Sequence, residues 1–340
     1  MKRKRQTQIG ILSAFGMLLL ILDAKTVLSG AKNGIEMCLF TVVPALFPFI
    51  VLSQPLNNSL LGQRITLLEP VRKLCRIPKG AESLFLLGIL GGYPVGAQSI
   101  GQAYRNGKIH RNDAERLLAF CNNAGPSFIF GILGSMFTSL RIPWLIWMTH
   151  ILSAITVGMI LPAKKSGECI IEKPKPITLN SALERGIRIM GSICGWVILF
   201  KICLCFFDHW VMRLFPSEVK YILYGFTELA NGCWLLTSLK SESLRFVLCN
   251  CFLSFGGLCV IMQTSSVTPG LEKRVFLQGK MLHCIISFIF SSFLQYLIFP
   301  DCQIALFHIS IAVTIVLLCI LILRHTIIKN YGRNLSTHDV

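Results

Sequence analysis

Long apolar runs broken by short polar clusters are the feature that most constrains this chain of 340 residues. Hydrophobic residues make up 53% of the sequence and charged residues only 14%, and the mean hydropathy is +0.64. A soluble domain carries about 25% charged residues. The sequence therefore excludes a soluble globular enzyme, a disordered chain and a coiled coil. It predicts an all-α polytopic membrane protein.

The basic charge and the cysteines fit the same class. The formal net charge is +17, and Lys and Arg collect in the cytoplasmic loops of membrane proteins, so we expect the lipid bilayer as partner and no nucleic acid. Most of the 14 cysteines lie in apolar runs, where cysteine behaves as a small hydrophobe. Neither a zinc-ligand spacing nor a nucleophile–base set is present, so we expect no metal, no cofactor and no enzyme activity.

Eight stretches are long enough to cross a bilayer, which takes about 20 apolar residues. They are residues 9–29, 35–55, 118–139, 143–162, 187–207, 246–266, 281–299 and 303–323. Two weaker segments are interrupted: residues 84–100 by the cluster Gly91 to Gly96, and residues 221–239 by Glu228, Asn231 and Gly232. Each weaker segment could cross the bilayer or form a re-entrant hairpin that enters and leaves on one side.

The distribution of Lys and Arg favours hairpins. With both termini inside and Lys201 left aside, two hairpins place 25 basic residues inside and 7 outside. If all ten segments cross, the numbers are 18 and 14. Because basic residues prefer the cytoplasmic side, we predict eight spans and two re-entrant hairpins.

This arrangement divides the chain into two similar units of opposite orientation. An N-terminal span, residues 1–34, precedes a first unit, residues 35–162, and a cytoplasmic linker, residues 163–186, leads to a second unit, residues 187–299. Residues 300–340 form the last span and a polar tail. Each unit has three crossings and one hairpin, so the units are inverted repeats. Paired broken segments in inverted repeats are typical of transporters, with the binding site between the repeats.

Interrupted segments supply the candidate substrate-binding residues, because a break frees backbone N–H and C=O groups at membrane depth. Alternatively, the small residues permit close helix packing. A carboxylate such as Glu228 is costly in the membrane, so it could take a proton or a cation, and Lys201 could neutralise it or an anionic substrate. The candidates are Gly92, Tyr93, Pro94, Gly96, Gln98, Asn122, Asn123 and Ser127 in the first unit, and Glu228, Asn231, Asn250, Ser254 and Gly256 in the second.

Several motifs resemble a known family. Gly91-Gly92-Tyr93-Pro94-Val95-Gly96-Ala97 and residues 114–129, with residues 226–232 and 253–258 in the second unit, are similar to the YlbJ-type sporulation integral membrane proteins, which carry a nucleoside-recognition or Gate domain. The resemblance covers residues 35–300. It departs from the expected pattern at Gln98, where a basic residue would follow Gly-Ala.

The resemblance implies a role in spore maturation. Such proteins are linked to the movement of dipicolinic acid across the outer forespore membrane, and the Gate domain is similar to part of concentrative nucleoside transporters. We therefore expect a transporter of a small polar anion, dipicolinate, in the outer forespore membrane. The alternatives are a nucleoside or ion transporter of the Gate type and an assembly factor that transports nothing. A second copy of the chain or other sporulation membrane proteins could be partners.

Overall fold

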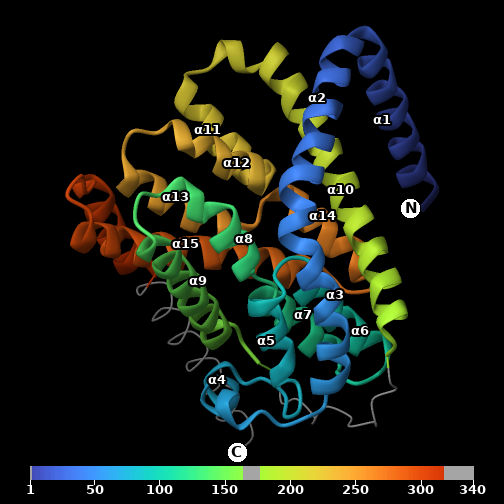
Figure 1. Ribbon diagram of the computed structural model, residues 1–340, viewed down its shortest axis with the longest axis vertical. Coiled ribbons are helices and arrows are strands. Elements are labelled where there is room, and N and C mark those ends of the chain that lie inside the picture. Colours follow the sequence, from blue (N-terminus) through green and yellow to red (C-terminus); the bar gives the residue numbers. More distant parts are fainter. Residues whose placement is uncertain (1, 164–176, 318–340) are drawn as a thin grey trace, which may run out of the picture.

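The computed structural model describes residues 2–163 and 177–317, and over these ranges it contains helices and no β-strand (Figure 1). The all-helical class predicted from the sequence is confirmed. In the first half the helices are α1 Lys2–Leu22, α2 Ala24–Met37, α3 Val43–Leu60, α4 Glu69–Cys75, α5 Glu82–Leu90, α6 Val95–Arg105, α7 Arg111–Cys121, α8 Pro126–Gly131 and α9 Arg141–Ile160. In the second half they are α10 Leu179–Trp210, α11 Ser217–Thr227, α12 Leu229–Leu235, α13 Glu242–Phe255, α14 Gly257–Val267 and α15 Arg274–Ile298.

Five helical stretches of the described residues are long and apolar enough to cross a bilayer. They are Ala24–Leu60, Arg141–Ile160, Leu179–Trp210, Glu242–Val267 and Arg274–Ile298. Two shorter apolar helices, Ser13–Leu22 and Ile304–Leu317, lie near the ends of the described chain. These helices support a membrane protein. The rest of the predicted span 303–323, the polar tail and residues 164–176 of the predicted linker lie outside the described residues.

The first two predicted spans are placed differently in the structure. The predicted span 9–29 is interrupted at Asp23, where α1 ends and α2 begins. The Asp23 carboxylate accepts a hydrogen bond from the Thr26 N–H, which satisfies one of the free donors at the start of α2. From Ala24 the chain stays helical to Leu60, with a π-helical turn at Cys38–Val42 that joins α2 to α3. The expected loop around residues 30–34 is therefore helix.

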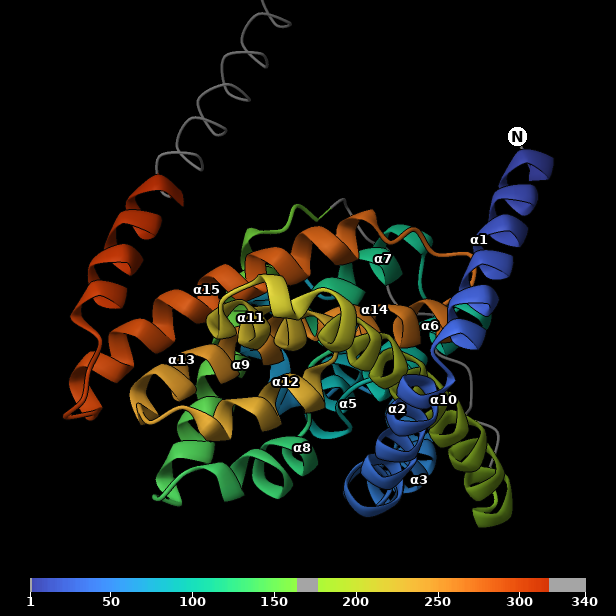
Figure 2. The ribbon, with the colours of Figure 1, turned by 90° about the horizontal axis from the view of Figure 1, so that it is seen from above.

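The order of elements recurs along the chain. A long helix (α2–α3 or α10) is followed by two short helices (α5 and α6, or α11 and α12), a broken helix (α7 and α8, or α13 and α14) and another long helix (α9 or α15). Seen from above, α2, α3 and α10 lie on one side of the molecule and α9, α13 and α15 on the other (Figure 2). The predicted start of the second unit at residue 187 lies within α10.

The two long helices α2 and α10 pack closely through glycines. A Cβ on Gly30 would lie 2.9 Å from Ile202 Cα, and one on Gly34 would lie 3.0 Å from Ile198 Cα. Glycines four residues apart occupy one face of a helix and let two backbones approach in a membrane. This contact joins the first long helices of the two halves.

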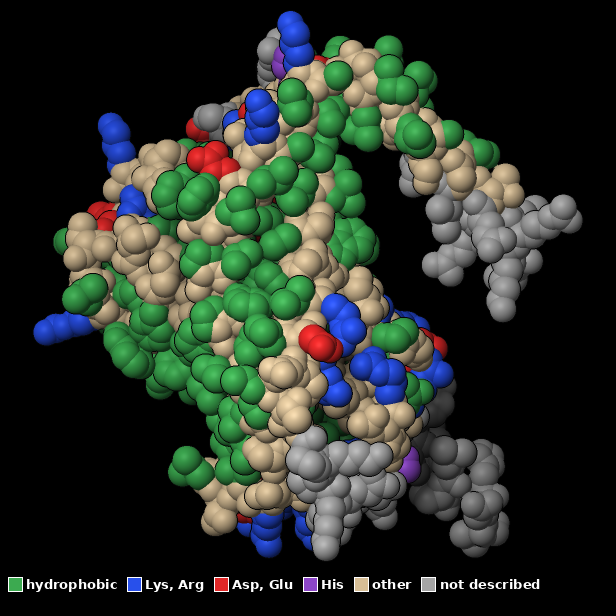
Figure 3. Space-filling model, turned by 45° about the vertical axis from the view of Figure 1, so that its right-hand side comes forward, with side chains coloured by type: hydrophobic (Ala, Val, Ile, Leu, Met, Phe, Trp, Pro, Cys, Tyr) green, Lys and Arg blue, Asp and Glu red, His purple; other side chains and the backbone are tan. Residues whose placement is uncertain are grey.

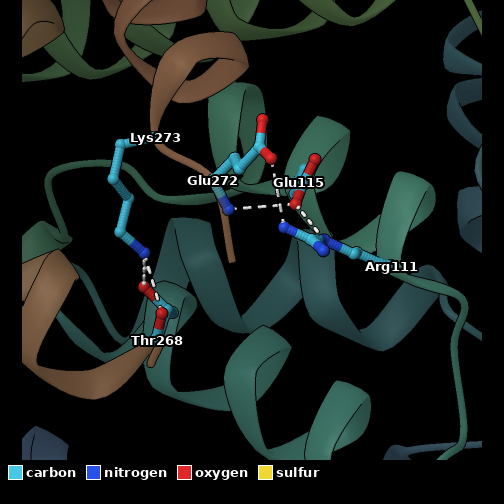
Figure 4. A network of polar contacts seen from close by, with 5 residues as sticks. All are labelled: Arg111, Glu115, Thr268, Glu272 and Lys273. Carbon is cyan, nitrogen blue, oxygen red and sulfur yellow. Dashed lines mark hydrogen bonds and ion pairs between the residues drawn. The ribbon is translucent and has the colours of Figure 1, made fainter. Parts of the chain in front are cut away.

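Side-chain contacts also join the turns that connect helices. The turn after α6 meets the turn after α14, where Arg111 bonds Glu115 and Glu272, and the Glu115 carboxylate accepts the Glu272 N–H (Figure 4). In the same view the Lys273 ammonium bonds the backbone oxygen and the hydroxyl of Thr268. Helix α7 begins at Arg111, and no side chain caps it.

Three further contacts group the remaining turns. The Glu242 carboxylate at the start of α13 accepts bonds from Thr138, just before α9. Trp210 at the end of α10 donates its indole N–H to Asp23 at 3.0 Å. The buried Arg116 guanidinium donates to backbone oxygens beyond α4 and at the end of α9. Each contact therefore holds together segments that are far apart in the sequence.

The surface between these ends is apolar. Figure 3 shows hydrophobic side chains over much of one face, with Lys and Arg side chains along its upper and left-hand edges and over its lower-right part and bottom. Large apolar residues such as Leu152, Leu199 and Phe293 are about half exposed. A broad apolar belt between charged ends is the surface that a bilayer covers.

Candidate functional site

The first hairpin and the first broken helix touch at their interruptions. The chain turns between α5 and α6 at Gly91 to Pro94, and it leaves helical geometry between α7 and α8 at Asn122 to Gly125. Gly92 has φ +73°, and a Cβ on it would lie only 2.8 Å from the backbone nitrogen of Gly125. A larger residue at position 92 would therefore hold the two breaks apart.

The second pair of interruptions makes the same kind of contact. Gly257 has φ +76°, and a Cβ on it would lie 3.2 Å from the backbone oxygen of Thr227, next to the interruption between α11 and α12. The neighbouring Gly256, with φ +87°, faces the first unit, because its Cβ would lie 3.4 Å from Tyr93 Cζ. All four interrupted segments therefore meet in one region.

Tyr93 and Lys280 link this region across the two halves. The Tyr93 hydroxyl donates to the backbone oxygen of Leu253 at 3.0 Å and accepts from the Lys280 ammonium at 2.8 Å. Lys280 also donates to the backbone oxygen of Asn122, and its nitrogen lies 4.8 Å from the centre of the Tyr93 ring. Lys280 is completely buried. No carboxylate of the described residues lies within ion-pair distance of it.

Two buried histidines lie beside Lys280. His150 of α9 and His283 of α15 stack with ring centres 4.7 Å apart. His150 Nε2 accepts the Ala124 N–H at 3.0 Å, in the break after α7, and His150 Nδ1 lies 3.1 Å from the Ser254 hydroxyl. His283 Nε2 lies 3.1 Å from the backbone oxygen of His150. The histidines thus connect the first break to the end of α13.

The two asparagines of the first break have different roles. The Asn122 side chain accepts the Ala97 N–H at 3.2 Å and donates to the Thr264 hydroxyl at 2.9 Å, so it ties α6 to α14. The Asn123 amide donates to the backbone oxygen of Phe120 at 2.8 Å, while its buried oxygen has no hydrogen-bond partner. Asn123 therefore has one free acceptor position. Because an unpartnered buried acceptor is costly, a donor from water or a ligand would be favourable there.

Glu228 caps a helix at the second interruption. Its carboxylate accepts from the backbone N–H groups of Ala230 and Asn231, and from the Asn231 side-chain amide at 2.6 Å. The Lys201 ammonium bonds the oxygen of the same Asn231 amide. Lys201 and Glu228 are therefore joined through Asn231 and make no direct ion pair. Three N–H donors suit an ionised carboxylate at a helix N-terminus.

A small cavity lies where the interrupted segments meet. Its volume is about 50 Å³. The interrupted segments of both halves contribute to its wall. Tyr93 and Gly125 come from the first half, and Glu228 and the amide of Gln263 in α14 come from the second. The rest of the wall is mainly apolar and comes largely from α3, α8, α10, α12 and α14. Small-molecule sites usually enclose about 300–1,000 Å³, so this cavity admits only water-sized molecules.

Some of the predicted site residues take part in the contacts between the interrupted segments, and others lie outside these contacts. Gly92, Tyr93, Asn122, Glu228, Ser254 and Gly256 belong to the contacts described above, and Asn231 adjoins them through Glu228. Pro94 caps α6, and Gly96 packs on α7, because a Cβ on it would lie 2.4 Å from the Cys121 oxygen. Asn250 bonds the backbone within α13. The hydroxyl of Ser127 and the amide oxygen of Gln98 are buried without a hydrogen-bond partner.

Sequence reasoning missed His150, Lys280 and His283. The predicted span 281–299 leaves Lys280 in the loop before it, although α15 begins at Arg274 and Lys280 lies inside the helix. The available signal was the spacing of Lys280 and His283, which puts both side chains on one face of an otherwise apolar helix. Over the described residues, no group of three or more His, Cys, Asp or Glu is arranged to hold a metal ion.

Comparison with known proteins supports the predicted resemblance. The chain is 24% identical over 289 residues to the sporulation integral membrane protein YlbJ of Bacillus subtilis (strain 168), which covers 72% of this chain and 71% of the relative. No family model matches the chain, and no solved structure matches it. The resemblance to YlbJ-type sporulation integral membrane proteins that the sequence motifs predicted is therefore confirmed.

Proposed function

We propose that this chain, as a relative of the YlbJ-type sporulation integral membrane proteins, transports a small polar anion across a membrane of a sporulating bacterium. The anion that we propose is dipicolinate, and the membrane is the outer forespore membrane. The observation that carries the proposal is the completely buried Lys280, which has no carboxylate partner among the described residues and lies where the interrupted segments meet.

An unpaired buried cation favours an anionic ligand. A buried ammonium loses its hydration, and hydrogen bonds to Tyr93 and Asn122 replace only part of it. A carboxylate within the same apolar surroundings would compensate the charge. Backbone N–H groups at the start of α14 would add further donors for an anion. Intramembrane charges of this kind commonly mark a substrate pathway.

The contacts between turns support the proposed topology of two re-entrant hairpins and two inverted repeats. With hairpins, the turns after α6 and α14, which Arg111 and Glu272 join, lie on the same side of the membrane. The turns joined by Thr138 and Glu242, and those joined by Asp23 and Trp210, lie together on the other side. If all ten segments crossed, each of these three contacts would have to span the bilayer.

Transport through this site requires the interrupted segments to separate. A cavity of about 50 Å³ is too small for an aromatic dicarboxylate. Tyr93 lines the cavity and bonds Lys280, which is not part of the wall. We propose that α5–α6 and α11–α12 move relative to the long helices to expose Lys280 to one side at a time. Rocking of one repeat against the other around a fixed site is a common transport mechanism.

Uptake of labelled dipicolinate into proteoliposomes that contain the full chain tests the proposal. We expect uptake above that of empty vesicles and inhibition by unlabelled dipicolinate. Absence of uptake with the substrate supplied from either side would refute it. Inhibition by nucleosides at lower concentration than dipicolinate would favour a Gate-type nucleoside transporter instead.

A role as an assembly factor predicts a different result. A chain that only holds other sporulation proteins in the membrane needs its surface and its fold, and it should tolerate a change of the buried Lys280. A transporter should insert normally and lose uptake after the same change. Complementation of a deletion strain with Lys280→Met, scored by spore dipicolinate content, separates the two roles.

A further inference from the structure

One nitrogen in the buried cluster has no hydrogen-bond partner: Nδ1 of His283, a completely buried residue. The other ring nitrogen, Nε2, lies 3.1 Å from the backbone oxygen of His150. A carbonyl oxygen only accepts, so Nε2 carries the hydrogen. In the neutral ring, Nδ1 is then a bare lone pair enclosed in the protein.

His150 differs in this respect from its stacked neighbour. Its Nε2 accepts the Ala124 N–H, so this nitrogen carries no hydrogen, and Nδ1 donates to the Ser254 hydroxyl. Both nitrogens are therefore occupied in the neutral ring. A proton added to His150 would oppose the Ala124 N–H and break that bond. Of the two stacked histidines, only His283 can gain a proton without losing a hydrogen bond.

The positive charge near His283 makes protonation of Nδ1 unfavourable before an anion binds. Lys280 precedes it by three residues on the same helix, and His150 faces it from α9. Of the other packed helices, α7 brings the Cys121 thiol near Lys280, and α13 brings the Cys251 thiol against Cys284 of α15. No described carboxylate pairs with the cluster. A second cation beside Lys280 would be unfavourable there, and a nearby anion would make it favourable.

We propose that His283 Nδ1 is the site at which a proton binds together with the anion, so that the transporter is a proton–anion symporter. This inference rests on the function proposed above. Dipicolinate carries two carboxylates, and Lys280 can balance only one of them. A proton from water on the entry side forms an N–H bond at Nδ1 as the anion binds. The bond breaks after reorientation, and the proton returns to water on the exit side.

The alternative proton site, Glu228, is already occupied. Its two oxygens accept three N–H donors from α12, and these bonds favour the ionised carboxylate, so a proton on Glu228 would weaken them. The sequence suggested Glu228 as a proton or cation carrier because it is a carboxylate at membrane depth. The hydrogen bonds favour a capping role for it and leave His283 as the proton acceptor.

Proton flux and dipicolinate uptake measured together in the same proteoliposomes test the inference. The reagents are labelled dipicolinate outside and a pH-sensitive dye trapped inside, with the full chain and with His283→Gln. Glutamine keeps a donor for the His150 oxygen and cannot take the proton. His308→Gln, an exposed histidine near the end of the described chain, is the matched control.

We expect acidification of the lumen with about one proton per anion for the unaltered chain and for His308→Gln. His283→Gln should lower this ratio at least fivefold, whatever its remaining rate of uptake. Uptake without acidification in the unaltered chain would overturn the inference and leave the proposed function standing, even if the variant fails to insert. An unchanged ratio in His283→Gln would also overturn it. Absence of all uptake would refute both proposals.

Discussion

Replacement of Lys280 by Met tests the electrostatic basis of the site. Methionine keeps the length and apolar body of the lysine side chain and removes its charge. Two unit charges 4 Å apart interact by about 4 kcal/mol at an effective dielectric constant of about 20. The lost ammonium also makes hydrogen bonds to Tyr93 and Asn122 that add little to anion binding. We expect a loss of about 2–4 kcal/mol in anion affinity, or roughly 30- to 1,000-fold.

The assay is the concentration dependence of dipicolinate uptake in proteoliposomes, with thermal unfolding of the detergent-solubilised protein measured in parallel. The unfolding temperature should stay unchanged or rise, because replacing a buried charge with an apolar side chain removes a desolvation cost. Lys273→Met is the matched control, since Lys273 caps the same helix outside the buried cluster and bonds only Thr268. If Lys280→Met transports with the affinity of the unaltered chain, the anion does not use this charge.

Three further predictions concern packing, capping and pH. Gly88→Ala should lower the stability by about 3 kcal/mol or more in thermal unfolding, because a Cβ there would lie 1.7 Å from a backbone oxygen of α7, whereas Gly191→Ala, with no atom within 4 Å, should be neutral. Glu228→Gln should cost about 1 kcal/mol through the weakened cap of α12, and an unchanged unfolding temperature would argue against that cap. The Arg72 guanidinium lowers the pKa of the Glu69 carboxyl from 4.5 to about 2. Its stabilising contribution is therefore complete above about pH 4.5 and disappears as the pH falls towards 2, and a carboxyl NMR titration of Glu69 with a midpoint near 4.5 would contradict the contact.

The positions of the interruptions could be predicted because they depend on local chemistry. Proline and glycine break an apolar helix wherever they gather, so the turn at Gly91 to Pro94 was visible in the sequence. The start of α2 was not, because a single aspartate inside an apolar window hardly changes its mean hydropathy. Asp23 caps the start of α2 through the bond to Thr26, which depends on the fold of that turn.

The buried cluster could be predicted only in part. Asn122 and Glu228 attract notice because they interrupt apolar segments. Lys280 lies directly before the predicted span 281–299, and a basic residue at the edge of a span usually extends to the cytoplasm. Its burial results from the packing of α15 against α7 and α9, which brings together residues more than 150 positions apart, such as Asn122 and Lys280. No local pattern contains that information.

The side of the membrane on which each turn lies decides whether the interrupted segments can enclose one site. Asn106, in the turn after α6, and Lys240, before α13, are both exposed, so Asn106→Cys and Lys240→Cys can each be labelled with a membrane-impermeant maleimide, with the unaltered chain as background. Two re-entrant hairpins predict that Asn106→Cys reacts only from the cytoplasmic face and Lys240→Cys only from the opposite face. Reaction of both from the same face would contradict the hairpins and the transport site between them.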